Sequence, residues 1–115
     1  MTPQEQAEQV RRYFRLVDEG RLAEMFAMFA PDIEYRRAGY GPIVGIDALR
    51  AFYEGPRGIA TIRHDIEVVA VDGPCVAIEG RARATLTDGG HFDRRIGEFF
   101  WFRDNRIVRR HGYQA

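Results

Sequence analysis

Two ionisable side chains lie on faces of the sequence that are otherwise apolar. His64 alternates with isoleucines in a pattern typical of a half-buried strand, and Glu98 lies in a row of phenylalanines. A histidine can act as a general base, whereas a carboxylate is costly to bury unless a donor or a cation compensates it. Each pattern also has a structural explanation. His64 could be a core histidine bonded to a backbone carbonyl, and Glu98 could be the buried partner of Arg81, Arg94 or Arg109.

Composition limits the chemistry available to the chain. All 17 basic residues are arginines, and the sequence contains neither lysine nor serine. This excludes a lysine Schiff base, a P-loop and a serine nucleophile. Because arginine stays protonated near neutral pH, proton transfer falls to histidine, aspartate, glutamate, tyrosine or Cys75. The net charge of zero gives no electrostatic reason to expect a nucleic acid or an anionic membrane as a partner.

The sequence predicts no metal site and no cofactor. His91 and His111 lack acidic or cysteine neighbours at the spacing of metal ligands. A single cysteine excludes both an internal disulfide and a CxxC metal site. The 115 residues have room for one domain, which we expect over residues 1–115. Residues 2–9 are polar, and no apolar run is long enough to span a membrane, so we expect a cytoplasmic protein.

The first part of the sequence predicts three helices. Thr2 and Glu5 are typical of a capping box, and an apolar stripe that includes Tyr13 continues the helix as far as Gly20. Tyr13 could there be no more than an amphipathic core residue. Two further helices are expected over residues 21–29 and 47–53.

After residue 58 the apolar period changes from helical to alternating. We expect a short strand over residues 33–37 and an antiparallel meander of four strands near residues 61–71, 75–86, 91–103 and 106–113. Helices first and hairpins afterwards indicate an α+β fold with the helices on one face of a curved sheet.

Two features of the predicted sheet point to binding surfaces. The inward face of the second long strand carries small residues in succession, which leaves volume that a packed core would fill. These residues are Gly80, Ala82 and Ala84, and the inward set of the strand before it reads Ile62, His64, Ile66 and Val68. On the opposite face of the sheet, Phe99 and Trp101 suggest a homodimer interface, unless the sheet folds back on itself to cover them.

Four segments carry a resemblance to a known superfamily: VRRYF at 10–14, FAPD at 29–32, GIDALRAFY at 45–53 and FRDNRIV at 102–108. Together they extend over nearly the whole chain. They resemble the nuclear-transport-factor-2-like superfamily, which includes ketosteroid isomerases, SnoaL-like polyketide cyclases and limonene-epoxide hydrolases. The resemblance implies a cone-like α+β fold in which three N-terminal helices pack on a curved, mainly antiparallel sheet that encloses a pocket.

The resemblance also implies roles for particular residues. Tyr13 is similar to the oxyanion-hole tyrosine of ketosteroid isomerases, and Glu98 falls where those enzymes keep a protonated aspartate as second donor. The base position of the isomerases corresponds to Arg37, which cannot abstract a proton at neutral pH. The epoxide hydrolases place an arginine and an aspartate two residues apart, where this chain reads Arg-Ala-Arg at residues 81–83.

Two kinds of function follow as expectations. As an isomerase or cyclase, the chain would use His64 to abstract a proton alpha to a carbonyl of an apolar polycyclic substrate, while Tyr13 and Glu98 bind the enolate. Alternatively, the same residues bind an apolar ligand without turnover, or the fold serves only for dimerisation. The residues expected to contact the ligand are Arg37, Tyr40, Phe52, Gly80, Ala82, Phe100 and Tyr113.

Overall fold

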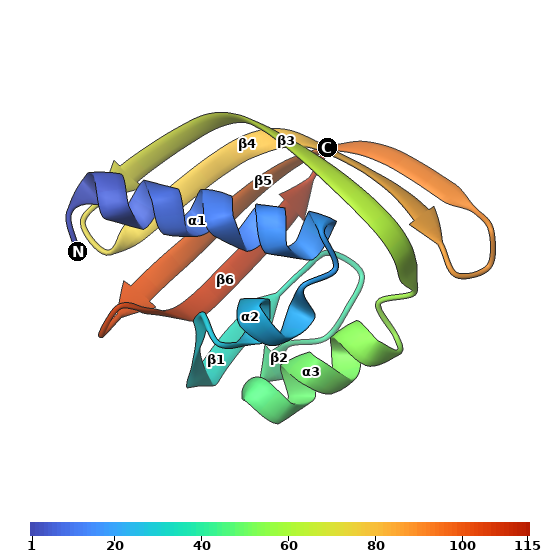
Figure 1. Cartoon of the computed structure of the whole chain (residues 1–115), viewed down its shortest axis with the longest axis horizontal. Coiled ribbons are helices and arrows are strands. Elements are labelled where there is room, and N and C mark those ends of the chain that lie inside the picture. Colours follow the sequence, from blue (N-terminus) through green and yellow to red (C-terminus); the bar gives the residue numbers. More distant parts are fainter.

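Three helices lie on the concave side of one curved sheet of six strands (Figure 1). The computed structural model describes all residues from Met1 to Ala115. The helices are α1 (Pro3–Asp18), α2 (Leu22–Phe26) and α3 (Ile46–Glu54), and the strands are β1 (Phe29–Arg36), β2 (Ile43–Val44), β3 (Ile59–Asp72), β4 (Cys75–Leu86), β5 (His91–Arg103) and β6 (Arg106–Gln114). The predicted α+β arrangement is confirmed. None of the helices has the length and apolarity needed to cross a membrane.

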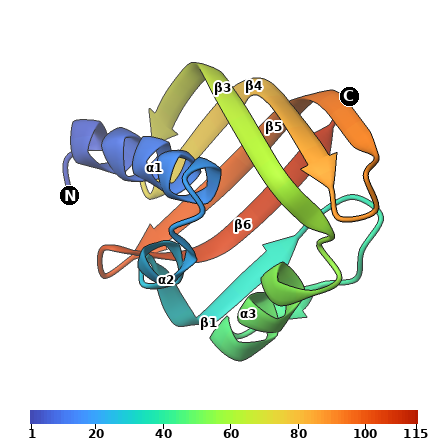
Figure 2. The ribbon, with the colours of Figure 1, turned by 45° about the vertical axis from the view of Figure 1, so that its right-hand side comes forward.

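The sheet combines the predicted meander with two further strands. Its order is β2-β1-β6-β5-β4-β3. Strands β3 to β6 are antiparallel neighbours, as their alternation predicts. Strand β1 lies parallel to β6, and the two-residue β2 pairs antiparallel with β1. Figure 2 shows how the sheet bends, so that α1 packs against β3 while α3 packs against β1.

Helix α1 begins and buries its apolar stripe as the sequence predicts. The Thr2 hydroxyl accepts a hydrogen bond from the Glu5 amide at 3.1 Å, and the Glu5 carboxylate accepts one from the Thr2 amide at 2.7 Å. Val10, Tyr13 and Phe14 are all buried in the core that the helix forms with the sheet. Tyr13 is thereby fixed on the inner face of the helix.

The second helix is shorter than expected. It ends at Phe26, whereas Phe29, predicted as its last residue, is the first residue of β1. Pro31, just beyond the expected helix, lies inside β1 where the pairing with β6 is irregular. A proline is accepted there because the regular hydrogen-bond ladder is interrupted.

A bulge in β3 changes which residues face inward. The pairing of β3 with β4 slips between Ile66 and Val68. Beyond the slip, Val69 and Val71 pack against the core, and Val68 is 53% exposed. The predicted inward position of Val68 is therefore wrong, because one extra residue reverses the alternation of a strand.

The same bulge explains Gly80. A Cβ atom at this position would collide with the backbone carbonyl of Asp65 and approach the Cα of Ile66 to 3.1 Å. Glycine thus allows the bulged backbone of β3 to lie against β4. The hollow expected above Gly80 is filled by this backbone, which is a correction to the sequence interpretation.

Candidate functional site

A small cavity of about 60 Å³ opens between α1, α3 and the inner face of the sheet. Most of its lining is apolar. The structure brings five of the predicted site residues to its wall: Tyr13, Arg37, His64, Ala82 and Glu98. Tyr113 also borders the cavity, although its ring packs against Phe99 on the outer face of the sheet. An apolar lining with a few convergent polar groups is typical of a small-molecule site.

The other predicted ligand contacts lie outside this cavity. Phe100 is fully buried in the core, and Gly80 is covered by the backbone of β3. Phe52 is buried on α3 between the rings of Tyr35 and Tyr40, and Tyr40 is 47% exposed in the loop after β1. Phe52 and Phe100 pack in the core, Gly80 accommodates the bulged backbone of β3, and Tyr40 lies against the ring of Phe52.

The carboxylate of Glu98 is held by a buried arginine. The Nε and Nη2 atoms of Arg110 donate to one Glu98 oxygen at 3.0 and 2.5 Å, and both side chains are more than nine-tenths buried. The partners considered from the sequence are engaged elsewhere, for example Arg81 with Asp93 at 2.6 Å. The contact with Arg110 is the buried ion pair with an arginine that the sequence left open for Glu98. Glu98 thereby positions Arg110, and the donor role that the resemblance implied for Glu98 stays a prediction.

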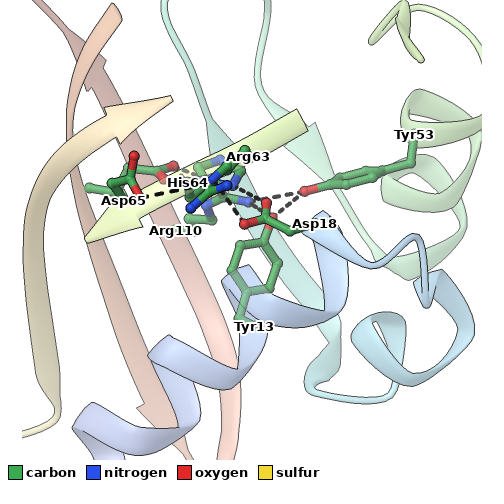
Figure 3. A network of polar contacts seen from close by, with 8 residues as sticks. Tyr13, Asp18, Tyr53, Arg63, His64, Asp65 and Arg110 are labelled. Carbon is green, nitrogen blue, oxygen red and sulfur yellow. Dashed lines mark hydrogen bonds and ion pairs between the residues drawn. The ribbon is translucent and has the colours of Figure 1, made fainter. Parts of the chain in front are cut away.

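Two tyrosines complete the cluster around Arg110 (Figure 3). Nη1 of Arg110 donates to the hydroxyls of both Tyr13 and Tyr53, and these hydroxyls also share a short hydrogen bond. Since each hydroxyl has one proton, the shared bond uses one of the two, and no protein group accepts the other. Both tyrosines line the cavity, so one phenolic proton is available to a ligand there.

Tyr13 and Tyr35 stay protonated over a wide pH range. Burial raises the pKa of Tyr13 well above its ordinary value, even though the charge of Arg110 acts in the opposite direction. Burial likewise raises the pKa of Tyr35, a third phenol on the cavity wall, to about 12. For Arg110, burial lowers the pKa, but Glu98 together with the phenols of Tyr13, Tyr35 and Tyr53 more than offsets this effect, and the pKa is raised well above its ordinary value. The cluster is thus a set of neutral donors around a fixed ion pair.

His64 is oriented by an aspartate at the end of α1. The Asp18 carboxylate accepts from the His64 ring at Nδ1 (2.6 Å) and from the backbone amide of His64 (2.9 Å) (Figure 3). Because a carboxylate can only accept, Nδ1 carries the proton in neutral His64, and Nε2 keeps its lone pair. The ring lines the cavity and is almost fully buried. The structural explanation offered above for His64 was a hydrogen bond to a backbone carbonyl. In the structure the partner of the ring is the Asp18 carboxylate instead.

Comparison with known proteins agrees with this architecture. A family model described as a SnoaL-like domain matches residues 10–110. The chain belongs to the SnoaL-like family. A search of curated protein sequences found no match.

Solved structures of other proteins share the SnoaL-like fold. An NTF2-like protein of unknown function from Burkholderia pseudomallei is 20% identical with a TM-score of 0.87, over 100% of this chain and 92% of its own. A candidate polyketide cyclase from Xanthomonas campestris is 22% identical with a TM-score of 0.88, over 98% and 92%. An LEH-like epoxide hydrolase from M. tuberculosis is 17% identical with a TM-score of 0.86, over 98% and 84%. At these identities the likeness establishes the fold.

Sequence reasoning missed four polar residues of this SnoaL-like site: Asp18, Tyr35, Tyr53 and Arg110. Strict alternation from buried Ile107 would place Arg109 inside, but the pairing of β6 with β5 skips Val108 and turns Arg110 inward. The irregular pairing is invisible in the residue pattern. Tyr53 could have been found, because the apolar stripe of α3 already placed it on the inner face.

Proposed function

We propose that the chain catalyses proton abstraction alpha to a carbonyl of an apolar substrate, with His64 as general base. The observation that carries this proposal is that a free imidazole nitrogen and a free phenolic proton belong to the wall of one cavity. A base and an oxyanion donor facing the same ligand are the two groups that enolisation requires.

Each group has a defined part in the proposed reaction. Nε2 of His64 takes the proton from the α-carbon, and the electron pair of the broken C–H bond forms the enolate. Asp18 holds the ring and balances the charge of the imidazolium. The free phenolic proton of the Tyr13–Tyr53 pair is donated to the enolate oxygen, while Glu98 and Arg110 fix the two phenols. Return of the proton to another carbon gives an isomer, and attack of the enolate on a second carbonyl gives a ring.

The cavity also supports the alternative of binding without turnover. Its wall places an apolar surface that includes Ile62, Phe92 and Ile96 beside the polar cluster. Arg37, at the position where ketosteroid isomerases have their base, remains a cation and has no part in proton removal. Catalysis and binding without turnover differ in whether His64 accelerates exchange of an α-proton. An apolar polycyclic ketone remains the predicted class of substrate.

We expect the phenolic donors to favour the ionised form of a bound phenol. Equilenin, a steroid phenol, should bind with a larger ionised fraction than it has in solution, as its fluorescence reports. Tyr13→Phe should reduce this preference about tenfold, and Tyr13→Phe/Tyr53→Phe about a hundredfold. The reason is that a hydrogen bond to a charged oxygen is stronger than a hydrogen bond to a neutral one. Tyr40→Phe, outside the cavity, is the control. An unchanged preference in the double variant would remove the tyrosines from the proposed donor site.

We further propose that two copies associate through the outer face of the sheet. Phe99 stacks on Trp101 at 6.0 Å between ring centroids, Tyr113 meets Phe99 edge-on, and Phe99 and Tyr113 are 39% and 57% exposed. The neighbouring charges are paired on the same face, for example Arg95 with Glu67 at 2.5 Å. Paired charges leave no net repulsion between two identical faces, and a central aromatic cluster is typical of an interface.

The dimer is tested by sedimentation equilibrium. The protein should sediment at twice its chain mass of 13.2 kDa. Phe99→Arg should give the monomer, because it buries an unpaired charge in the interface. Val44→Arg, on the edge strand β2, should stay dimeric. A wild-type monomer, or a dimeric Phe99→Arg protein, would argue against this surface. Residence in the cytoplasm likewise remains a prediction.

A further inference from the structure

We propose that Arg37 and Arg57 form a site for a carboxylate group of the substrate at the mouth of the cavity. Arg37 follows β1, and Arg57 lies in the turn after α3, so two separate segments contribute these side chains to the lining of one cavity. The inference rests on the proposed use of the cavity as a substrate site. It adds the chemical class of the substrate, an apolar carbonyl compound that carries an acidic group.

Neither arginine has a carboxylate or a hydrogen-bond partner within the protein. Most arginines of the chain form an ion pair with a carboxylate, such as Arg103 with Asp32 at 2.6 Å. No carboxylate lies within 4.0 Å of Arg37 or Arg57, and neither side chain takes part in a hydrogen bond. Both are nevertheless partly buried, so part of their hydration has been lost without replacement.

Aromatic rings hold both guanidinium groups in place. Cζ of Arg37 lies 5.3 Å from the ring centroid of Phe52, and Cζ of Arg57 lies 4.5 Å from that of Tyr53. The two rings are neighbours on α3, with centroids 6.0 Å apart. A guanidinium above a ring keeps its N–H groups free at the edge. The packing of Phe52 therefore acquires a second use, because it supports Arg37.

The charges of the cavity wall favour an anion. Glu98 is the one carboxylate of the lining, and its charge is already balanced by Arg110. Four of the five N–H groups that an arginine carries are engaged at Arg110, with Glu98, Tyr13 and Tyr53. The positive charge that remains is that of Arg37 and Arg57. A carboxylate matches two guanidinium edges through charge-assisted hydrogen bonds, whereas a neutral ligand would leave both cations unpaired.

Isosteric probes test the site. 2-Naphthoate and 2-naphthamide have the same shape and differ in charge, and their dissociation constants can be measured by calorimetry. The wild-type protein should bind 2-naphthoate at least tenfold more tightly than 2-naphthamide. Arg37→Gln and Arg57→Gln should each reduce this preference severalfold, and the double variant should abolish it. Arg11→Gln removes an unpaired arginine of α1 outside the cavity and should retain the full preference. Thermal unfolding of each variant shows whether the fold is kept.

The outcomes separate this inference from the proposed function. Equal affinity of the wild-type protein for both probes, or a preference that survives in the double variant, would overturn the carboxylate site. Exchange of the α-protons of the neutral ketone 2-tetralone reports on His64 independently. If the preference depends on both arginines but exchange does not depend on His64, the carboxylate site stands and the catalytic proposal falls.

Discussion

Replacing His64 with alanine is expected to slow the exchange of the α-protons of 2-tetralone by about two to four orders of magnitude, which is the usual contribution of a general base. The loss should be large because neither arginine nor a phenol with a raised pKa can accept a proton near neutral pH. Exchange is measured as loss of the α-proton signals by NMR in D₂O, against the rate without protein.

Two further variants make the result specific. Asp18→Asn should give an intermediate loss of about tenfold to a hundredfold, because the ring keeps its place but loses the carboxylate that balances its positive charge. His91→Ala removes an exposed histidine at the start of β5 and should leave the rate unchanged. If the wild-type protein exchanges no faster than buffer, or the His64→Ala protein is as fast as wild type, His64 is not the base.

Arg110→Met is expected to destabilise the protein by about 3–5 kcal/mol, because it leaves the carboxylate of Glu98 buried without a partner. The guanidinium also packs on the rings of Tyr13 and Tyr35, with Cζ 4.5 and 4.6 Å from their centroids. The free energy of unfolding is obtained from urea denaturation followed by circular dichroism.

A double variant that also removes the Glu98 carboxylate tests whether the lost stability comes from that unpaired charge. Arg110→Met/Glu98→Leu should recover most of the lost stability, since apolar residues of similar volume replace a buried ion pair at little cost. Arg109→Met, on the neighbouring residue of the outer face, should change stability by less than about 1 kcal/mol. If Arg110→Met alone also changed the free energy of unfolding by less than about 1 kcal/mol, the ion pair would not be buried as described.

The fold follows from patterns that act over short stretches of sequence. The capping box at Thr2 and the helical period of the residues after it are local, so α1 could be predicted. The four strands of the meander are adjacent in sequence and joined by tight turns, which makes their order predictable as well. The parallel pairing of β1 with β6 joins segments about 75 residues apart, so no local sequence pattern predicts this pairing.

The site was predictable only in part, for two physical reasons. Bulges shift a strand by one residue, which moved Val68 out of the core and brought Arg110 in instead of Arg109. Polar networks also depend on long-range contacts. Asp18 meets His64 only because the end of α1 lies over β3, and Tyr53 meets Tyr13 only because α3 closes the same cavity.

The central claim is that His64 and the phenols of Tyr13 and Tyr53 face one ligand, and a crystal structure of the complex with equilenin tests it most directly. The account predicts the phenol oxygen within hydrogen-bond distance of the Tyr13 or Tyr53 hydroxyl, with a ring carbon next to it about 3.5 Å from Nε2 of His64. Equilenin bound at another surface, or with its phenol turned away from both tyrosines, would contradict it.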